Sequence, residues 1–173
     1  MQEFIKHLEE HYKPIRKFDE IDWWIISKER RLSEDFIREF QDKVNWYEIS
    51  RYQNLSEDFI REFQDVLNWY YISRDQKLSE DFIRKFQHKV IWYAISRYQL
   101  ISEDFIREFQ DEVDWECISI YQELSEDFIK EFQHKVYWNH ILKFQTLSEK
   151  FIKKYKDYPK KKWYEFWKWF KKK

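Results

Sequence analysis

The residues of this 173-residue chain that could do chemistry are its paired carboxylates, its histidines and its single cysteine. A Glu-Asp pair recurs at one position of a repeated pattern, from Glu34/Asp35 to Glu126/Asp127. A catalytic acid-base pair occurs once, in asymmetric surroundings that separate its two pKa values. The five copies therefore indicate helix starts, where negative charge complements the helix dipole, and together they could form an acidic ridge for a basic partner.

The histidines and the cysteine lack the neighbouring residues that a metal site or a catalytic site requires. His7 and His11 are spaced as two metal ligands on one helix face, but no third ligand follows nearby. His88 and His134 occupy equivalent, variable positions of the repeated pattern, and Cys117 has no matching Cys-His arrangement. We therefore predict a non-enzymatic protein with no catalytic residues, no metal site, no cofactor and no small-molecule substrate.

The composition excludes further kinds of site. The chain contains no glycine, which the phosphate-binding loops, the dinucleotide fingerprint and the Gly-x-Ser-x-Gly nucleophile elbow all require. No stretch approaches the roughly 18 apolar residues that span a bilayer, and residues 1–11 lack the apolar run of a signal peptide. A single cysteine fits a reducing compartment. These features predict an all-α, intracellular protein.

The elements that position these residues form a repeat of 23 residues. Its pattern is L-S-E-D-F-I-R-E-F-Q-D-x-V-x-W-x-x-I-S-x-Y-Q-x, and the copies begin at Leu32, Leu55, Leu78, Ile101, Leu124 and Leu147. Five copies are complete, the sixth keeps its first half, and a degenerate copy around Trp23, Ile26 and Ser27 precedes them. The turns between copies contain no glycine and follow Gln53, Gln76, Gln99, Gln122 and Gln145.

Each copy predicts two short helices of about ten and eight residues, because serine starts the first apolar helical face and Asn or Asp precedes most of the second ones. Asn45, Asn68 and Asp114 can cap a second helix, whereas Ile91 and Tyr137 cannot. Helices this short are marginal alone, so they must stack on their neighbours. The predicted fold is an α-solenoid with three segments: an N-terminal helix and degenerate repeat (1–31), five repeats (32–146), and a partial repeat with a capping helix (147–173).

Comparison of the copies separates a predicted core from a predicted surface. The constant positions, represented by Phe36, Ile37, Phe40, Trp46 and Ile49, are assigned to the core. The positions that vary between copies are assigned to the open surface, where they would bind a partner unless they reflect drift on a solvated face. The predicted partner-binding residues are Glu48, Tyr71, Ala94, Cys117 and His140 in one column, and Tyr47, Tyr70 and Tyr93 in another.

The C-terminal segment is basic, whereas the rest of the chain is acidic. Residues 147–173 contain eleven lysines and three acidic residues, which gives +8 and leaves −9 for the remainder. Trp163, Phe166, Trp167 and Phe170 follow helical spacing and predict a cap on the last repeat. Residues outside that face could instead bind nucleic acid or an anionic membrane, or act as a nuclear-import signal: Lys160, Lys161, Lys162, Tyr164, Lys168, Trp169, Lys171, Lys172 and Lys173.

The string S-E-D-F-I-R-E-F-x-D-x-V-x-W-x-x-I-S-x-x-Q resembles the short repeats of uncharacterised proteins of giant DNA viruses of amoebae, of the mimivirus and marseillevirus kind, over residues 21–155. That family has no established activity, so the resemblance implies only a viral origin and a place in the host cytoplasm. A place in the nucleus would follow from the import signal at Pro159–Lys162. The expected function is a scaffold that mediates protein-protein interaction with a host or viral partner. The alternative is association with nucleic acid or anionic membrane through the C-terminal tail.

Overall fold

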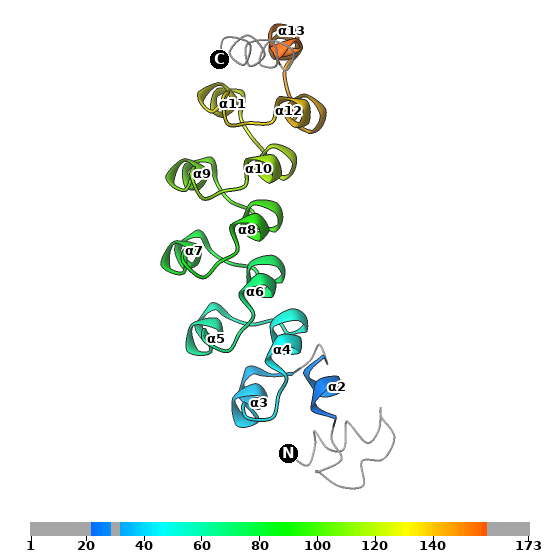
Figure 1. Cartoon of the computed structure of the whole chain (residues 1–173), viewed down its shortest axis with the longest axis vertical. Helices are drawn as coiled ribbons and strands as arrows, with labels where there is room; N and C mark the ends of the chain where they lie inside the picture. Colours follow the sequence, from blue (N-terminus) through cyan, green and yellow to red (C-terminus); the bar gives the residue numbers. More distant parts are fainter. Residues whose placement is uncertain (1–21, 29–31, 159–173) are drawn as a thin grey trace, which may run out of the picture. The chain divides into compact units, whose positions relative to one another are not determined.

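The computed structural model describes residues 22–28 and 32–158, and every regular element in these ranges is a short α-helix (Figure 1). The prediction of an all-α solenoid of two-helix, 23-residue repeats is confirmed. The first helices of the repeats are α3 (Glu34–Glu39), α5 (Glu57–Glu62), α7 (Glu80–Lys85), α9 (Glu103–Glu108), α11 (Glu126–Glu131) and α13 (Glu149–Tyr155). The second helices are α2 (Trp23–Ser27), α4 (Trp46–Tyr52), α6 (Trp69–Asp75), α8 (Trp92–Tyr98), α10 (Trp115–Tyr121) and α12 (Trp138–Phe144).

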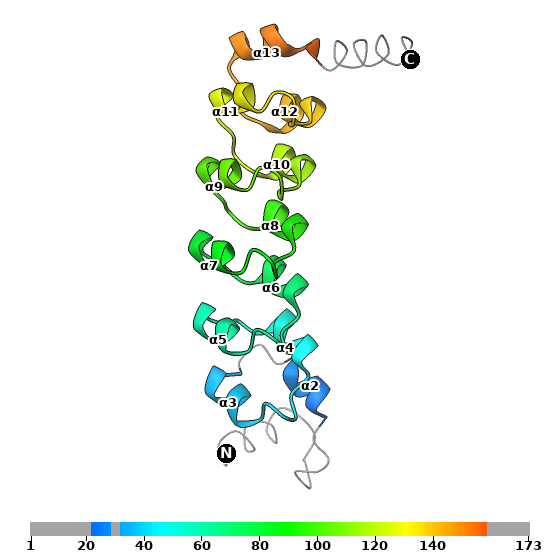
Figure 2. The ribbon, with the colours of Figure 1, turned by 60° about the vertical axis from the view of Figure 1, so that its left-hand side comes forward.

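The chain divides into two compact units, Met1–Ile72 and Ser73–Lys173, called here the N-terminal and C-terminal units. In the C-terminal unit, α7, α9 and α11 follow one another in one column, and α8, α10 and α12 form a second column (Figure 1, Figure 2). Helix α10 packs directly on both α8 and α12, and in the N-terminal unit α2 packs on α4. The predicted N-terminal helix and C-terminal capping helix lie outside the described residues.

Most of the predicted helix caps are present. The Oγ atom of Ser102 accepts a hydrogen bond from the amide of Phe105 at 3.1 Å, and each first helix begins in the same way. Asn45 and Asp114 cap their second helices, whereas the predicted absence of a side-chain cap at Ile91 and Tyr137 is confirmed. The first helices of the complete repeats have six residues rather than the expected ten. Each ends at a phenylalanine, such as Phe109, whose φ of −108° and ψ of 33° leave the helical region.

The core consists of isoleucines on both helices and of aromatic rings that join consecutive repeats. Ile95 and Ile118 are fully buried, as are their counterparts on the other helices from α3 to α12, whereas Ile152 on α13 is 41% exposed. The ring of Trp92 packs on two phenylalanines of the next repeat, at centroid distances of 6.2 Å to Phe105 and 4.9 Å to Phe109. The tryptophans of the repeat were predicted to lie in the buried core, but most of them are only half-buried. The ring N–H groups of Trp46, Trp69, Trp115 and Trp138 each donate to the carbonyl five residues earlier, as Trp115 does to Gln110 at 2.8 Å.

The turns between repeats form without glycine because a buried glutamine from the next repeat makes hydrogen bonds to their backbone. No described residue has a positive φ, and Gln99, which ends α8, is extended with φ −90° and ψ 146°. This leaves carbonyl groups of the last helical turn without helical partners. The Nε2 group of Gln122 donates to the carbonyls of Ser96 and Gln99, both at 2.9 Å, and its Oε1 atom accepts from the amide of Ile101 at 3.4 Å. Gln53, Gln99 and Gln145 make equivalent bonds to the repeats before them.

A buried serine provides a second link between repeats. Ser119 donates from its Oγ to the carbonyl of Trp115 at 2.7 Å and accepts from the amide of Tyr137, in the next repeat, at 3.0 Å. Ser27 makes the same two bonds, to Trp23 and from Asn45. This confirms the alignment of the degenerate first copy with the complete repeats. Leu142 occupies the serine position of the last complete copy and has no hydroxyl to accept such a bond.

Candidate functional site

The first column of predicted partner-binding residues is not a surface. Glu48, Tyr71, Ala94 and Cys117 have exposures of 9% or less, and their assignment to the open surface is wrong. Cys117 lies beside the buried residues Ile118 and Ser119, on the side of α10 that is covered by the stack of helices. The side chain at this position therefore varies inside the core, where repeats differ in the volume that they fill.

Only the last member of this column, His140, is partly accessible. It lies in α12, and its Nε2 is 3.3 Å from the Oε1 of Glu116 in the preceding repeat. The His140 ring lies 6.0 Å from the rings of both Tyr137 and Phe144. This residue therefore belongs to a cluster of polar and aromatic groups at the second-helix edge of the last repeats.

The second column is exposed, as predicted. Tyr47, Tyr70 and Tyr93 are between 38% and 47% exposed, although each ring also contacts a neighbouring side chain or its own helix. In the N-terminal unit, the hydroxyl groups of Tyr47 and Tyr71 are 2.6 Å apart, and their rings meet edge to face. In the C-terminal unit, the hydroxyl of Tyr93 accepts a hydrogen bond from Arg97 at 2.6 Å.

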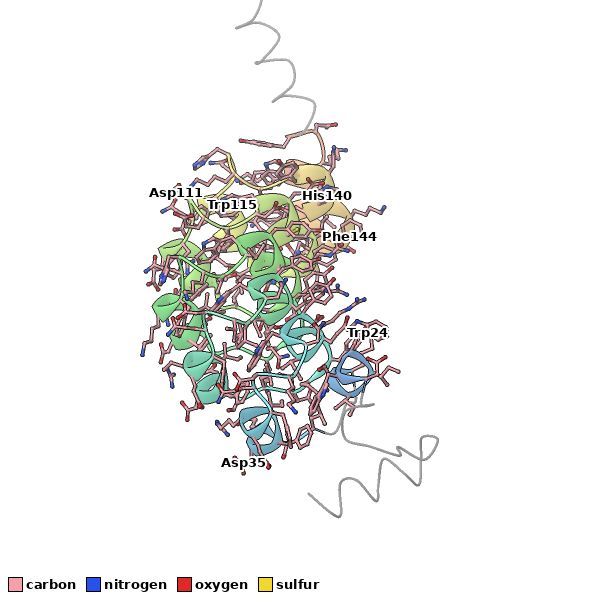
Figure 3. The ribbon with its side chains drawn as sticks, turned by 60° about the horizontal axis from the view of Figure 1, so that its bottom comes forward. Trp24, Asp35, Asp111, Trp115, His140 and Phe144 are labelled. Carbon is pink, nitrogen blue, oxygen red and sulfur yellow. The ribbon has the colours of Figure 1, made fainter. Side chains whose placement is uncertain are left out.

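The most exposed aromatic column of the C-terminal unit was missed by the comparison of copies. Tyr98, Tyr121 and Phe144 end three adjacent second helices and are 44%, 46% and 48% exposed. This position is nearly constant between copies, and constant positions were predicted to belong to the core. Its helical phase gave no contrary signal, because a residue three positions beyond the fully buried isoleucine falls on the same side of an ideal helix. Figure 3 shows His140 and Phe144 at the edge of the second helices, away from Asp111.

We call the exposed second-helix surface of the C-terminal unit the aromatic face and define it as Tyr93, Arg97, Tyr98, Ile120, Tyr121 and Phe144. The Arg97 guanidinium carbon lies 5.2 Å from the ring centroid of Tyr98 and 4.9 Å from that of Tyr121. The hydrogen bond to Tyr93 is the main cause that raises the pKa of Arg97. The aromatic face therefore holds a permanent positive charge between the rings of two consecutive repeats.

The first-helix side of the same unit has a different character, because its charges pair with one another. Arg84 contacts Glu80, Asp81 and, in the next repeat, Glu108 at 2.7 Å. Arg107 repeats this pattern with its own neighbours. The Oε1 atom of Glu80 also accepts a hydrogen bond from the backbone amide of Ser102, in the next repeat, at 2.7 Å. The glutamates of the Glu-Asp pairs thus join repeats in addition to complementing helix dipoles, and the aspartates remain exposed.

No family model, curated protein or solved structure matches the chain. Within residues 22–28 and 32–158, no group of three His, Cys, Asp or Glu side chains is placed to hold a metal ion. None of the helices described in these ranges is long and apolar enough to cross a membrane. Burial raises the pKa of the Cys117 thiol to about 11, which keeps it protonated at neutral pH. The tail residues 160–173 lie outside the described part of the chain.

Proposed function

We propose that the protein is a non-enzymatic helical-repeat scaffold that binds another protein through its aromatic face. The observation that carries this proposal is the line of exposed rings formed by Tyr98, Tyr121 and Phe144 on three second helices. Helix α10 packs on both α8 and α12, so these rings belong to one continuous surface. Tyrosine, phenylalanine and arginine are enriched in protein interfaces, where they contribute much of the binding energy.

The origin and location of the protein belong to the same proposal. The amino-acid sequence of the repeat, through its resemblance to repeats of giant viruses, supports a viral protein. The single Cys117 supports a reducing, intracellular compartment of the host, either cytoplasm or nucleus. The partner would then be a host or viral protein. No small-molecule substrate, catalytic residue or cofactor is part of this proposal.

The test is affinity capture with chemical cross-linking, using the full chain as bait in a lysate of the host cell. The triple variant Tyr98→Ser/Tyr121→Ser/Phe144→Ser removes the exposed rings. The matched control, Asp81→Ser/Asp104→Ser/Asp127→Ser, changes three almost fully exposed residues of the same three repeats on the first-helix side. We expect the control to retain the partners of the original chain and the aromatic variant to lose them. Retention by an aromatic variant with unchanged helix content would contradict the proposal.

The alternative function is association with nucleic acid or anionic membrane through the basic tail. The observation that favours it is the density of cations at this end, where residues 160–173 include Lys160, Lys161, Lys162, Lys168, Lys171, Lys172 and Lys173. Changing all seven to Gln in the full chain should abolish binding to a 30-base single-stranded DNA, or to vesicles containing phosphatidylserine, at low salt. Absence of binding by the unmodified chain to either probe would exclude this function.

A further inference from the structure

Arg97 differs from the other arginines in the described part of the C-terminal unit, because no carboxylate pairs with it. Arg84 and Arg107 each contact three carboxylates, and Arg74 contacts Asp75 at 3.3 Å. The single side-chain hydrogen bond of Arg97 goes to the hydroxyl of Tyr93. Its guanidinium is otherwise held by the rings of tyrosines in its own repeat and the next. The structure therefore presents an uncompensated cation on an exposed aromatic surface.

This arrangement prepares Arg97 to accept a carboxylate. A guanidinium carries five N–H donors in its plane, and contact with an aromatic ring leaves donors on its edge for a carboxylate. Restriction of the side chain by the tyrosines also lowers the conformational entropy that is lost when a ligand binds. The aromatic face therefore includes a charged subsite that is specific for a planar anion.

An apolar subsite lies one repeat further along the same face. Ile120 occupies in α10 the position that Arg97 occupies in α8, and it precedes Tyr121 as Arg97 precedes Tyr98. Ile120 is half-buried, and the exposed rings of Tyr121 and Phe144 belong to its own repeat and the next. The face thus offers a cation between one pair of repeats and a hydrocarbon surface between the following pair.

The distance between these subsites suits an extended peptide. Packed helices are separated by about 8–10 Å, which sets the approximate step from one repeat to the next. A polyproline II segment advances by about 3.1 Å per residue, so three residues cover about 9 Å. Side chains three positions apart in such a segment would reach the charged and the apolar subsite together.

The charge of the face argues against a nucleic acid as its ligand. Residues 91–100, 114–123 and 137–146 contain two basic residues, Arg97 and Lys143, and three acidic residues, Asp114, Glu116 and Glu123, which gives 2 − 3 = −1. A surface that tracks a phosphate backbone needs several cations, because each phosphate contact requires one. One isolated guanidinium beside apolar surface matches one carboxylate followed by an apolar side chain.

We infer that the aromatic face binds an extended acidic segment of a partner protein, with an Asp or Glu carboxylate on Arg97 and an apolar side chain three residues away against Ile120, Tyr121 and Phe144. This inference rests on the proposed function and specifies the class of partner for the same surface.

The test uses the full chain and fluorescence anisotropy with labelled peptides of defined sequence. The probe contains Asp-Pro-Pro-Leu between short proline flanks, and its controls contain Asn-Pro-Pro-Leu and Asp-Pro-Pro-Ser. Removal of the carboxylate should weaken binding about tenfold, because a charge-assisted hydrogen bond is lost. Removal of the leucine should weaken it about fivefold through the loss of apolar burial. Equal binding of the Asp and Asn peptides, or no binding of the probe at 1 mM (about the weakest affinity that the assay measures), would overturn the inference.

Matched variants of the protein test whether Arg97 is the group that binds the carboxylate. Arg97→Gln should bind the Asp and Asn peptides equally, whereas Arg84→Gln, the same change on the first-helix side, should keep the tenfold preference. Ile120→Ser should reduce the advantage of leucine over serine and leave the preference for Asp unchanged. A labelled oligo-dT strand provides the competing class of ligand. Binding of that strand by the original chain and its loss in Arg97→Gln would assign the face to nucleic acid and refute the acidic peptide.

Failure of this inference and failure of the proposed function give different results. If the peptides do not bind but the Tyr98/Tyr121/Phe144 variant still loses its captured partner, the acidic-segment inference is wrong and the scaffold function stands. If that variant keeps every captured partner, the scaffold function through this face is wrong as well. Circular dichroism and thermal unfolding of each variant establish that the loss of binding is not a loss of folding.

Discussion

Replacement of Gln122 by leucine should destabilise the protein strongly, although it exchanges one side chain for another of similar volume. Gln122 is 4% exposed, and its amide group binds two carbonyls and one amide of the preceding turn. Leucine leaves these backbone groups buried without a partner. The sequence alone places this residue at the turn between repeats, where all five complete copies have glutamine, and does not show what its side chain binds.

The two carbonyl bonds dominate the expected loss, because both are 2.9 Å long whereas the bond from the amide of Ile101 is 3.4 Å. A buried polar group without a partner costs about 1–3 kcal/mol, so the two carbonyls together cost about 2–6 kcal/mol. Burial of the more apolar leucine side chain recovers about 1 kcal/mol. The net expectation is a loss of about 3 kcal/mol in the free energy of unfolding.

The assay is urea unfolding followed by circular dichroism at 222 nm, with a second spectroscopic probe because repeat arrays do not always unfold in one step. The matched control is Gln87→Leu, the same change at an exposed residue of the same unit, which should alter the free energy by less than about 0.5 kcal/mol. Gln145→Leu should cost less than Gln122→Leu, since Gln145 is half-exposed. If Gln122→Leu is no more destabilising than Gln87→Leu, the glutamine does not stabilise the glycine-free turn.

Three further changes test other parts of the structure. Trp92→Ala should cost about 2–4 kcal/mol in denaturant unfolding, because its ring packs on two phenylalanines of the next repeat, and a loss below about 1 kcal/mol would mean that the ring faces solvent. Ser96→Ala should cost about 1–2 kcal/mol and speed hydrogen exchange at the amide of Asp114, which loses its acceptor, and unchanged exchange would refute this link. Cys117 should react with a disulfide reagent at pH 8 about a hundredfold more slowly than in urea, because burial raises its pKa from 9.0 to about 11. The folded chain holds this proton more tightly than the unfolded chain, so the associated stability is complete below pH 9 and is lost as pH rises toward 11. Cys117→Ala should remove that part of the pH dependence, and rapid labelling of the native thiol would contradict its burial.

The sequence was sufficient for features that depend on neighbouring residues of one repeat. The serine before each Glu-Asp pair could be assigned as a helix cap because its partner lies three residues away, and the structure confirms this at Ser102. The missing caps at Ile91 and Tyr137 follow from their side chains, which have no suitable acceptor at that distance. The period of 23 residues likewise predicted stacking, because helices so short cannot be stable alone.

Features that depend on contacts between repeats were decided by the tertiary structure. Gln122 has the sequence surroundings of a turn residue, yet its partners lie 21 to 26 residues away and become neighbours only when the repeats stack. Cys117 and Ala94 vary between copies and are nevertheless buried, because each repeat can fill the same interior position with a different volume. Tyr121 is nearly constant between copies and is nevertheless exposed. Variation among copies reports which side chains a position tolerates, whereas burial depends on which helix faces are covered by the adjacent repeat. The amino-acid sequence by itself therefore determined the repeat, its helices and their caps, and the packing of one repeat on the next decided which residues are buried and which are exposed.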